Sequence, residues 1–203
     1  MFELLLIRHG QTEWNAIRRV MGRQPIPLNN EGKAQARLLA KSLKEVPFTA
    51  IYTSPVMRAL QTSQIIMKGR DSVPLYEEPG FAEIDYGDWI NKDFKDIPEL
   101  AGFFENPSNV PIPNGEQLPE VIERARSAIE RIKEKHNNER VLAVSHADVI
   151  KVILIHYLGL PIDETQRFRI DNCSVSALHF GSIKEPRLIC VNTVGDIKRY
   201  CHL

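Results

Sequence analysis

The chain has 203 residues, 43% of them hydrophobic, which is enough to bury the core of one sizeable domain, and we expect residues 1–203 to form one. Its 26 basic and 26 acidic side chains cancel, so no overall field draws it to nucleic acid or to an anionic membrane, and any anion site must be local. No apolar run approaches the roughly 20 residues of a membrane span, the N-terminus lacks the features of a signal peptide, and the three cysteines favour free thiols in a reducing compartment, so we expect a cytoplasmic protein.

The first predicted element is a buried strand near the N-terminus. Residues 4–7 are four consecutive apolar residues, which is typical of a strand covered on both faces. The run ends in Arg8, His9 and Gly10 and is followed by a polar loop at residues 11–15. In an open α/β sheet, ligands bind outside the carboxyl ends of the strands. Arg8 and His9 therefore stand where such a protein keeps its chemistry.

A helix is expected next. Asn29 can cap it, and the apolar pattern continues to about Val46, where Pro47 ends it. The stripe that we expect this helix to bury contains Leu38, Leu39, Leu43 and Val46.

A strand and a second helix follow. Residues 50–53 predict the strand, and Ser54 and Pro55 predict the N-cap and the first turn of the helix. Arg58 lies in that first turn, close to the carboxyl end of the strand. Residues 73–76 are a further strand candidate. The inward-facing residues expected of this helix are Met57, Leu60 and Ile65.

The pattern is irregular between residues 77 and 114, where only residues 91–105 have helical character. Long irregular segments within a compact domain are commonly functional. We therefore expect residues 77–114 to form a small cap-like insertion that faces the substrate.

The C-terminal half returns to a regular pattern. Residues 117–136 predict an amphipathic helix, residues 140–144 a buried strand, and Gly159 the end of the helix that follows that strand. Residues 174–180 and 187–194 alternate like a terminal hairpin. The alternation of strands and helices predicts an α/β fold with three α-β-α layers, a mostly parallel sheet and an antiparallel edge.

Four polar groups are expected to meet at one rim of this sheet: Arg8 with His9, Arg58, Glu83 and His146. Two guanidinium groups at one rim need an anion, and their forked geometry matches phosphate oxygens. His146 immediately precedes a helix, whose first N–H groups favour negative charge. One imidazole can serve as a nucleophile, the other can stabilise charge, and the carboxyl group can donate a proton.

Other chemistries fit these residues less well. His9, His146 and Glu83 could ligate zinc, but the sequence has no His-Glu-x-x-His pair, and two adjacent arginines would repel a dication. Ser145 is not in a nucleophile elbow, and no glycine-rich phosphate loop is present. We therefore expect neither a metal ion nor another cofactor.

The same residues lie in blocks that resemble the histidine phosphatase superfamily, also called phosphoglycerate mutase-like. Asn29 stands where threonine is usual in the family, and Ala147 where glycine is common. The blocks, in chain order, are residues 8–15 (RHGQTEWN), 27–36 (PLNNEGKAQA), 53–62 (TSPVMRALQT), Glu83 with Gly87 and Trp89, and 145–147 (SHA).

The resemblance implies a role for each residue. It implies that His9 attacks phosphorus and carries the phosphoryl group, and that Glu83 protonates the leaving oxygen and later activates water. Arg8, Arg58 and His146 complete the implied catalytic set. The phosphate- and substrate-binding residues expected are Arg8, Asn15, Gly22, Arg58, His146 and His202.

Three functions remain open. A phosphomonoester hydrolase is favoured over a 2,3-bisphosphoglycerate-dependent mutase because only 62 residues, without an Arg-Arg pair, separate Glu83 from His146. Arg124 and Arg126, which lie between them, are expected on a solvated helix face. A non-catalytic phosphate-binding module is the third possibility, but it should have lost His9 or Glu83.

The leaving group is less defined than the reaction. The tail at residues 201–203 is similar to tails of metal-independent phosphoserine phosphatases, which makes phosphoserine the leading candidate and suggests that His202 binds the substrate carboxylate. Phosphorylated α-ribazole and sugar phosphates are alternatives. The expected partner is thus a small phosphomonoester, and the terminal hairpin could expose an edge that pairs in a homodimer.

Overall fold

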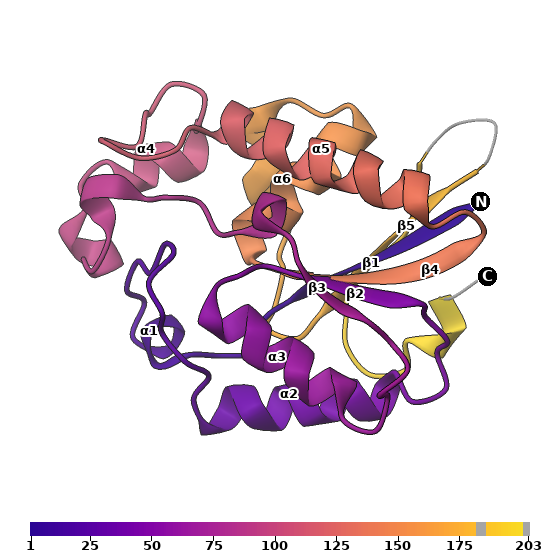
Figure 1. Cartoon of the computed structure of the whole chain (residues 1–203). Coiled ribbons are helices and arrows are strands. Elements are labelled where there is room, and N and C mark those ends of the chain that lie inside the picture. Colours follow the sequence, from indigo (N-terminus) through magenta and orange to yellow (C-terminus); the bar gives the residue numbers. More distant parts are fainter. Residues whose placement is uncertain (182–185, 201–203) are drawn as a thin grey trace.

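A computed structural model describes residues 1–181 and 186–200 of the chain. In these residues six strands form one sheet in the order β3-β2-β4-β1-β5-β6 (Figure 1). β1 to β4 pair in parallel, while β5 is antiparallel to β1 and to β6, which confirms the mostly parallel sheet with an antiparallel edge. The strands are β1 (Phe2–Arg8), β2 (Ala50–Thr53), β3 (Leu75–Glu77), β4 (Glu139–Ser145), β5 (Val175–Phe180) and β6 (Arg187–Thr193).

Helices cover both faces of this sheet, which confirms the three-layer prediction. The helices α2 (Asn30–Ser42) and α3 (Met57–Met67) lie on one face, and α5 (Leu118–Lys135) and α6 (Ala147–Leu158) lie on the other (Figure 1). No helix of the described ranges combines the length and the apolarity needed to cross a membrane.

The central strand β1 joins the two halves of the core. Its apolar residues are buried on both faces, as the run at residues 4–7 predicts. Leu4 and Leu6 pack in the cluster that α5 and α6 cover, and Leu5 and Ile7 pack in the cluster that α2 and α3 cover. Because side chains alternate along a strand, a continuous apolar run at this position supplies both cores.

Helix α2 is shorter than predicted. The Asn29 side chain accepts a hydrogen bond from the N–H of Gly32 at 2.8 Å, as expected of a cap, but the helix ends at Ser42 rather than near Val46. Leu38 was placed in the buried stripe wrongly, since it is 67% exposed. It precedes Leu39 by one position and therefore points about 100° away from it around the helix.

Helix α3 also departs from the prediction. It begins at Met57 with Val56 at the N-cap, where Ser54 was expected, and the Ser54 hydroxyl instead accepts a hydrogen bond from the N–H of Val56. Met57 was expected to face inward but is 39% exposed, whereas Arg58 is fully buried. The buried face of this helix includes a charged side chain, so the pattern of apolar residues cannot predict which face is buried.

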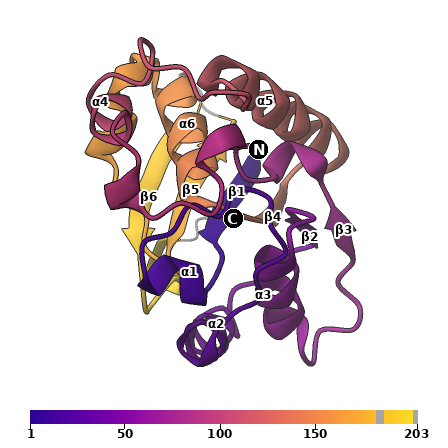
Figure 2. The ribbon, with the colours of Figure 1, turned by 90° about the vertical axis from the view of Figure 1, so that its left-hand side faces the viewer.

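The segment between β3 and α5 contains little regular helix. Only α4 (Leu100–Glu105) is α-helical within the predicted range 91–105, and the 3₁₀ turns η2 (Gly87–Trp89) and η3 (Phe94–Asp96) lie before it. Asn91 has a positive φ of 68°, and the extended Ile97 precedes Pro98 in the middle of the range, so no single helix can run from residue 91 to residue 105. Together with α1 (Glu13–Ala16), α4 stands at the carboxyl ends of the parallel strands (Figure 2).

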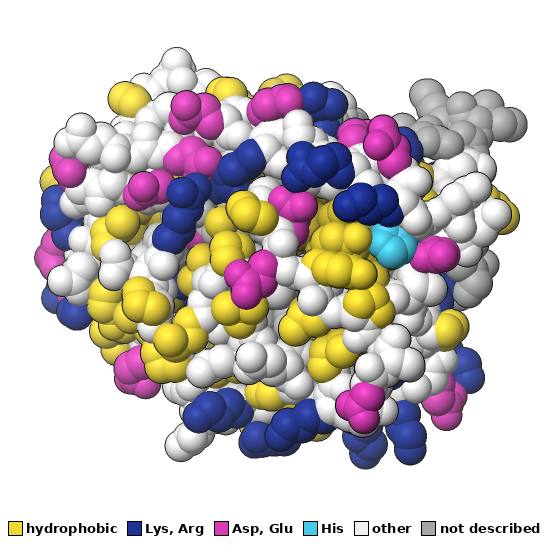
Figure 3. Space-filling view, in the orientation of Figure 1, with side chains coloured by type: hydrophobic (Ala, Val, Ile, Leu, Met, Phe, Trp, Pro, Cys, Tyr) yellow, Lys and Arg dark blue, Asp and Glu magenta, His cyan; other side chains and the backbone are white. Residues whose placement is uncertain are grey.

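One edge of the sheet is exposed at β3. Hydrophobic side chains gather over the middle of the face seen in Figure 3, where β3 forms the near edge of the sheet. Tyr76 of this strand is 48% exposed. The strand is only three residues long, and short edge strands limit unwanted pairing with other chains.

A close contact between two backbones positions the loop that follows β1. A Cβ atom on Gly32 would lie 2.0 Å from the Gln11 carbonyl oxygen, and one on Gly10 would lie 2.5 Å from the Gly32 carbonyl oxygen. The first turn of α2 therefore packs directly against residues 10 and 11, next to His9.

Gly32→Ala should lower the free energy of unfolding by about 1–3 kcal/mol, because neither backbone can move without disturbing the core. Urea denaturation measures the change. The control is Gly102→Ala within α4, where the new Cβ would meet only Val110 at 3.4 Å and should stabilise by roughly 0.5–1 kcal/mol. Equal effects of the two substitutions would contradict the proposed packing.

Candidate active site

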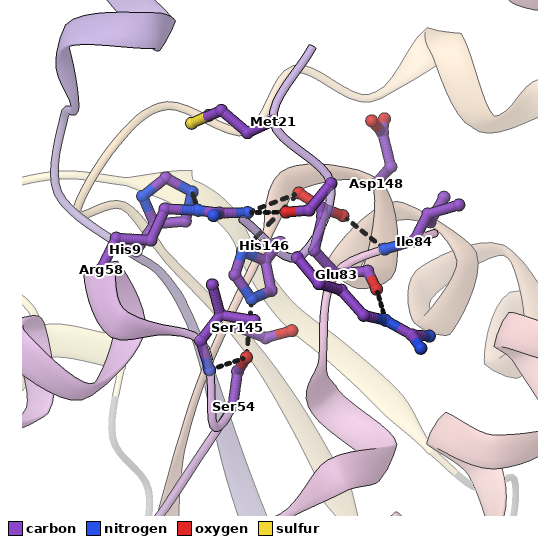
Figure 4. Close-up of polar contacts among 12 residues, drawn as sticks. His9, Met21, Ser54, Arg58, Glu83, Ile84, Ser145, His146 and Asp148 are labelled. Carbon is purple, nitrogen blue, oxygen red and sulfur yellow. Dashed lines mark hydrogen bonds and ion pairs between the residues drawn. The ribbon is translucent and has the colours of Figure 1, made fainter. Parts of the chain in front are cut away.

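Separate elements bring four of the expected catalytic residues, His9, Arg58, Glu83 and His146, together at the carboxyl ends of the parallel strands (Figure 4). β1 and β4 pair with Arg8 opposite Ser145, so the next residues, His9 and His146, are neighbours with ring centroids 5.1 Å apart. Arg58 arrives from α3, and Glu83 from the loop after the 3₁₀ turn η1 (Pro79–Phe81). A cavity of about 610 Å³ opens beside them.

His9 is held in one tautomer. Its Nδ1 lies 2.7 Å from the carbonyl oxygen of Gly10, and its Nε2 lies 3.1 Å from Nε of Arg58. Because a carbonyl only accepts and a guanidinium only donates, Nδ1 carries the proton and Nε2 the lone pair. Burial, with Arg58 and Arg8 nearby, lowers the pKa of His9 well below its ordinary value of 6.5. The ring is therefore neutral at physiological pH, and Nε2 is available as a nucleophile.

Arg58 occupies the floor behind His9 and is 0% exposed. Its Nη2 donates to the carbonyl oxygen of Gly22 at 2.9 Å and lies 3.6 Å from Oε2 of Glu83 (Figure 4). Burial lowers the pKa of Arg58 to about 10, a value at which the side chain still carries its charge at neutral pH. This buried cation is thus held between a carbonyl and a carboxyl group.

His146 lies on the same floor and is also 0% exposed. Its Nε2 is 2.7 Å from the Ser54 hydroxyl, and its Nδ1 is 3.6 Å from Oε2 of Glu83 without any hydrogen bond in the described part of the chain. Burial and then the charge of Arg58 lower its pKa well below the ordinary value. A ligand that supplied an acceptor would satisfy the unpartnered nitrogen.

Glu83 has the opposite pKa shift. Burial raises its pKa to about 7 and Asp148 adds to the rise, although Arg58 opposes it. Oε1 accepts a hydrogen bond from the Ile84 N–H at 3.0 Å, which orients the carboxyl group. A carboxyl group with this pKa is partly protonated at neutral pH and can both donate and accept a proton.

Arg124 does not lie on a solvated face, contrary to the prediction. Its guanidinium binds both carboxylate oxygens of Glu116, at 2.6 and 3.0 Å, and also the carbonyl oxygens of Gly80 and Glu83. It therefore anchors the loop that carries Glu83. Its position three residues after Val121 and four before Ala128 could have revealed this, because both neighbours lie on the buried stripe of α5. Arg126 is 40% exposed and paired with Glu123.

The other expected binding residues have different surroundings. Arg8 lines the cavity, and its Nη1 donates to the Ile170 carbonyl oxygen at 2.7 Å while its buried Nε has no partner in the described residues. Asn15 also lines the cavity, and its Oδ1 accepts from the N–H of Thr12. Gly22 lines the cavity and uses its carbonyl to hold Arg58.

His202 lies outside the described residues. The last described element, η5 (Lys198–Tyr200), lies near the amino ends of the parallel strands, on the opposite side of the sheet's length from α1 and α4 (Figure 1). There Lys198 forms an ion pair with Glu45 at 2.8 Å.

Sequence reasoning missed two acidic side chains of the cavity, Asp171 and, closer to the expected site in the sequence, Asp148. The Asp148 carboxylate accepts a hydrogen bond from the Tyr86 hydroxyl at 2.6 Å and pairs with Lys151 at 3.0 Å. Its place in the first turn of α6, two residues after His146, was the available signal. Within the described ranges, no three His, Cys, Asp or Glu side chains are grouped so that they could hold a metal ion.

The sequence and the overall fold are similar to those of known proteins. The model of the histidine phosphatase superfamily (branch 1) matches residues 4–193. Phosphoserine phosphatase 1 of Hydrogenobacter thermophilus is 30% identical over all of this chain and 95% of its own length. A probable phosphoglycerate mutase, GpmB of Photorhabdus laumondii, is 32% identical over 97% of this chain and 94% of its own. The solved structure of YhfR from Bacillus stearothermophilus is 31% identical, with a TM-score of 0.89 over 97% of this chain and all of that one.

The imidazoles of His9 and His146 should remain neutral well below pH 6.5, the ordinary value for histidine. An NMR pH titration measures this, with the two rings assigned from the His9→Asn and His146→Asn variants. Because the unfolded chain binds these protons more readily, stability should start to fall as the pH drops below about 6.5 and continue to fall towards the lower pKa values of the folded state. Titration midpoints near 6.5 would contradict the hydrogen-bond assignment above.

Proposed function

The chain belongs to the histidine phosphatase superfamily (branch 1), and we propose that it hydrolyses small phosphomonoesters through a phosphohistidine on His9, without a metal ion. The observation that carries this proposal is the geometry of the cavity floor, where the Arg58 guanidinium lies 3.1 Å from Nε2 of His9 and 3.6 Å from the Glu83 carboxyl group. The pKa shifts of the two groups support it. His9 is neutral with its lone pair on Nε2, and Glu83 opposite has a pKa of about 7. A nucleophile and a proton donor are thereby available at the same pH.

In the first step, the lone pair on Nε2 of His9 forms a bond to phosphorus as the bond from phosphorus to the leaving oxygen breaks. The carboxyl group of Glu83 gives its proton to that oxygen, so that an alcohol departs and a carboxylate remains. The guanidinium groups of Arg8 and Arg58 supply positive charge for the phosphoryl oxygens. His146 and Asn15 hold the remaining oxygens in this proposal.

In the second step, water attacks the phosphorus of the phosphohistidine. The Glu83 carboxylate takes a proton from that water, and the bond between phosphorus and Nε2 breaks. Inorganic phosphate leaves, and both His9 and Glu83 return to their starting protonation states. The charge that a metal ion would bring is supplied by the two arginines, so no step requires one.

A hydrolase is favoured over a mutase because Arg124 and Arg126, two of the arginines between Glu83 and His146, already bind other groups of the protein. Arg124 is bound to Glu116 and to the loop of Glu83, and Arg126 is exposed and paired with Glu123. Neither is free to bind a second phosphorylated substrate. Phosphoserine remains the leading substrate, supported by the relative from Hydrogenobacter thermophilus, ahead of phosphorylated α-ribazole and sugar phosphates. Residues 77–114 would act as the cap.

The proposal is tested with p-nitrophenyl phosphate in excess EDTA, where we expect full hydrolysis. A phosphoenzyme trapped by denaturing base should be stable in base, labile in acid and missing from the His9→Ala variant. Loss of activity on chelation that zinc or magnesium restores would contradict the metal-independent mechanism. Acid-stable phosphate on another residue would contradict the role of His9.

Glu83→Gln keeps the acceptor for the Ile84 N–H but removes the proton donor. The ratio kcat/KM, which reports only the step that releases the leaving group, should fall by roughly 10²–10⁴-fold for phosphoserine. For p-nitrophenyl phosphate, whose leaving group needs no proton, kcat/KM should fall far less. In the unmodified enzyme kcat/KM for phosphoserine should decline as the pH rises through about 7, because the donor must be protonated. The variant should lack that decline. Equal slowing of both substrates would indicate that Glu83 only shapes the site.

A further inference from the structure

The mouth of the cavity carries more positive charge than its phosphate site requires. Four arginines line the cavity: Arg8, Arg18, Arg19 and Arg169. Arg8 stands at the end of β1, immediately before His9, and belongs to the phosphate site proposed above. Arg18, Arg19 and Arg169 differ in whether an acidic side chain of the protein neutralises their charge.

Two of these three arginines have their charge neutralised by an acidic side chain. Arg19 is paired with Asp93 at 2.8 Å and lies over the ring of Trp14. Arg169 binds both carboxylate oxygens of Asp171, at 2.9 and 3.1 Å. Their guanidinium groups are therefore occupied by neighbouring acids of the same protein.

Arg18 is different. It is exposed, and its guanidinium makes no hydrogen bond or ion pair with any residue in the described ranges, although it lines the cavity. Besides Glu83, two acidic side chains line the cavity, Asp148 and Asp171. They already bind Lys151 and Arg169, respectively. Arg18 thus presents an uncompensated, forked cation to whatever enters.

The backbone of Arg18 is held in an unusual conformation. Its φ is +55°, in the left-handed region that residues other than glycine seldom adopt. Hydrogen bonds fix it on both sides: its N–H donates to the Asn15 carbonyl oxygen at 3.2 Å, and its carbonyl accepts from the Phe94 N–H at 3.0 Å. Glycine would be the relaxed residue at this place, and an outlier of this kind beside a cavity motivates a functional explanation.

We propose that Arg18 is a specificity residue that binds a carboxylate on the leaving group of the substrate. The inference rests on the proposed phosphatase function. The transferred phosphoryl group would sit on the cavity floor at His9, and Arg18 would bind a second anion at the mouth. The cavity of about 610 Å³ has room for a carbon skeleton between the two. A guanidinium fork matches the two oxygens of a carboxylate, so the substrate class is a phosphomonoester of a small carboxylic acid.

The experiment compares substrates that differ only in the carboxylate. One pair is 3-phosphoglycerate and glycerol 3-phosphate, and the other is phosphoserine and phosphoethanolamine. In Arg18→Gly, kcat/KM should fall about tenfold for the two acids, equivalent to about 1.4 kcal/mol, and stay within about twofold for the two substrates without a carboxylate. Because glycine relieves the left-handed strain, the variant should unfold at the temperature of the parent or above it.

Two further variants sharpen the comparison. Arg18→Lys keeps the charge without the fork and should lose less than Arg18→Gly. Arg169→Gln removes an arginine of the same cavity whose charge Asp171 already neutralises, so it should leave the ratio between acid and non-acid substrates unchanged. A change in Arg169→Gln equal to that in Arg18→Gly would overturn the proposal, because the effect would then be one of overall charge.

The remaining outcomes separate the inference from the function on which it rests. If the parent protein hydrolyses all four substrates and Arg18→Gly leaves their ratios unchanged, Arg18 is not a specificity residue and the phosphatase function stands. If Arg18→Gly affects only fructose 1,6-bisphosphate relative to fructose 6-phosphate, the second anion is a phosphoryl group and the carboxylate assignment is wrong. If the parent hydrolyses no phosphomonoester, the proposed function itself fails.

Discussion

The site depends on the burial of one positive charge, the guanidinium of Arg58. This fully buried side chain is bound by the imidazole of His9 and the carbonyl oxygen of Gly22, both from the loop after β1, and by the carboxyl group of Glu83 from the loop after η1. Breaking a buried charge network by removing one partner costs about 3–5 kcal/mol. The loop after β1, the first turn of α3 and the loop after η1 therefore fix one another through a single side chain from α3.

The same burial makes the proposed chemistry possible at one pH. With ordinary pKa values of about 6.5 for histidine and 4.3 for glutamate, a neutral imidazole and a protonated carboxyl group are not both abundant at any pH. Removal from water favours the neutral form of each group, so it lowers the pKa of a histidine and raises that of a carboxyl group. At this site the pKa of His9 lies well below its ordinary value and that of Glu83 is about 7, which opens a range in which both neutral forms coexist.

Much of the fold could be predicted from the sequence, and so could the meeting of His9, Arg58, Glu83 and His146 at one rim. A continuous apolar run requires a strand buried on both faces, and parallel strands end at one rim. The failures share a different cause. Met57 faces solvent while Arg58 is buried. Arg124, which was expected on a solvated face, binds the loop of Glu83 instead. In each case tertiary partners compensate a charge in the interior, and neither apolar periodicity nor local propensity carries information about partners that are distant in sequence. The 3₁₀ turns on either side of Asn91 were missed for a local reason. Asn91 has a positive φ, and the helical pattern of residues 91–105 does not indicate it.

The floor and the mouth of the cavity are constrained to different degrees, and this difference separates the reaction from the choice of substrate. Arg58, His9 and Glu83 are buried and bound to one another, so a change in any of them disturbs the whole floor. At the mouth, Arg18 is exposed and its guanidinium makes no hydrogen bond or ion pair with a described residue, and the partner of the Arg169 guanidinium is a single neighbouring carboxylate. Substitutions there leave the floor intact. Proteins that have the same residues on the cavity floor can therefore catalyse the same reaction on substrates with different leaving groups. For this reason the motifs of this chain identify the type of reaction more closely than the substrate.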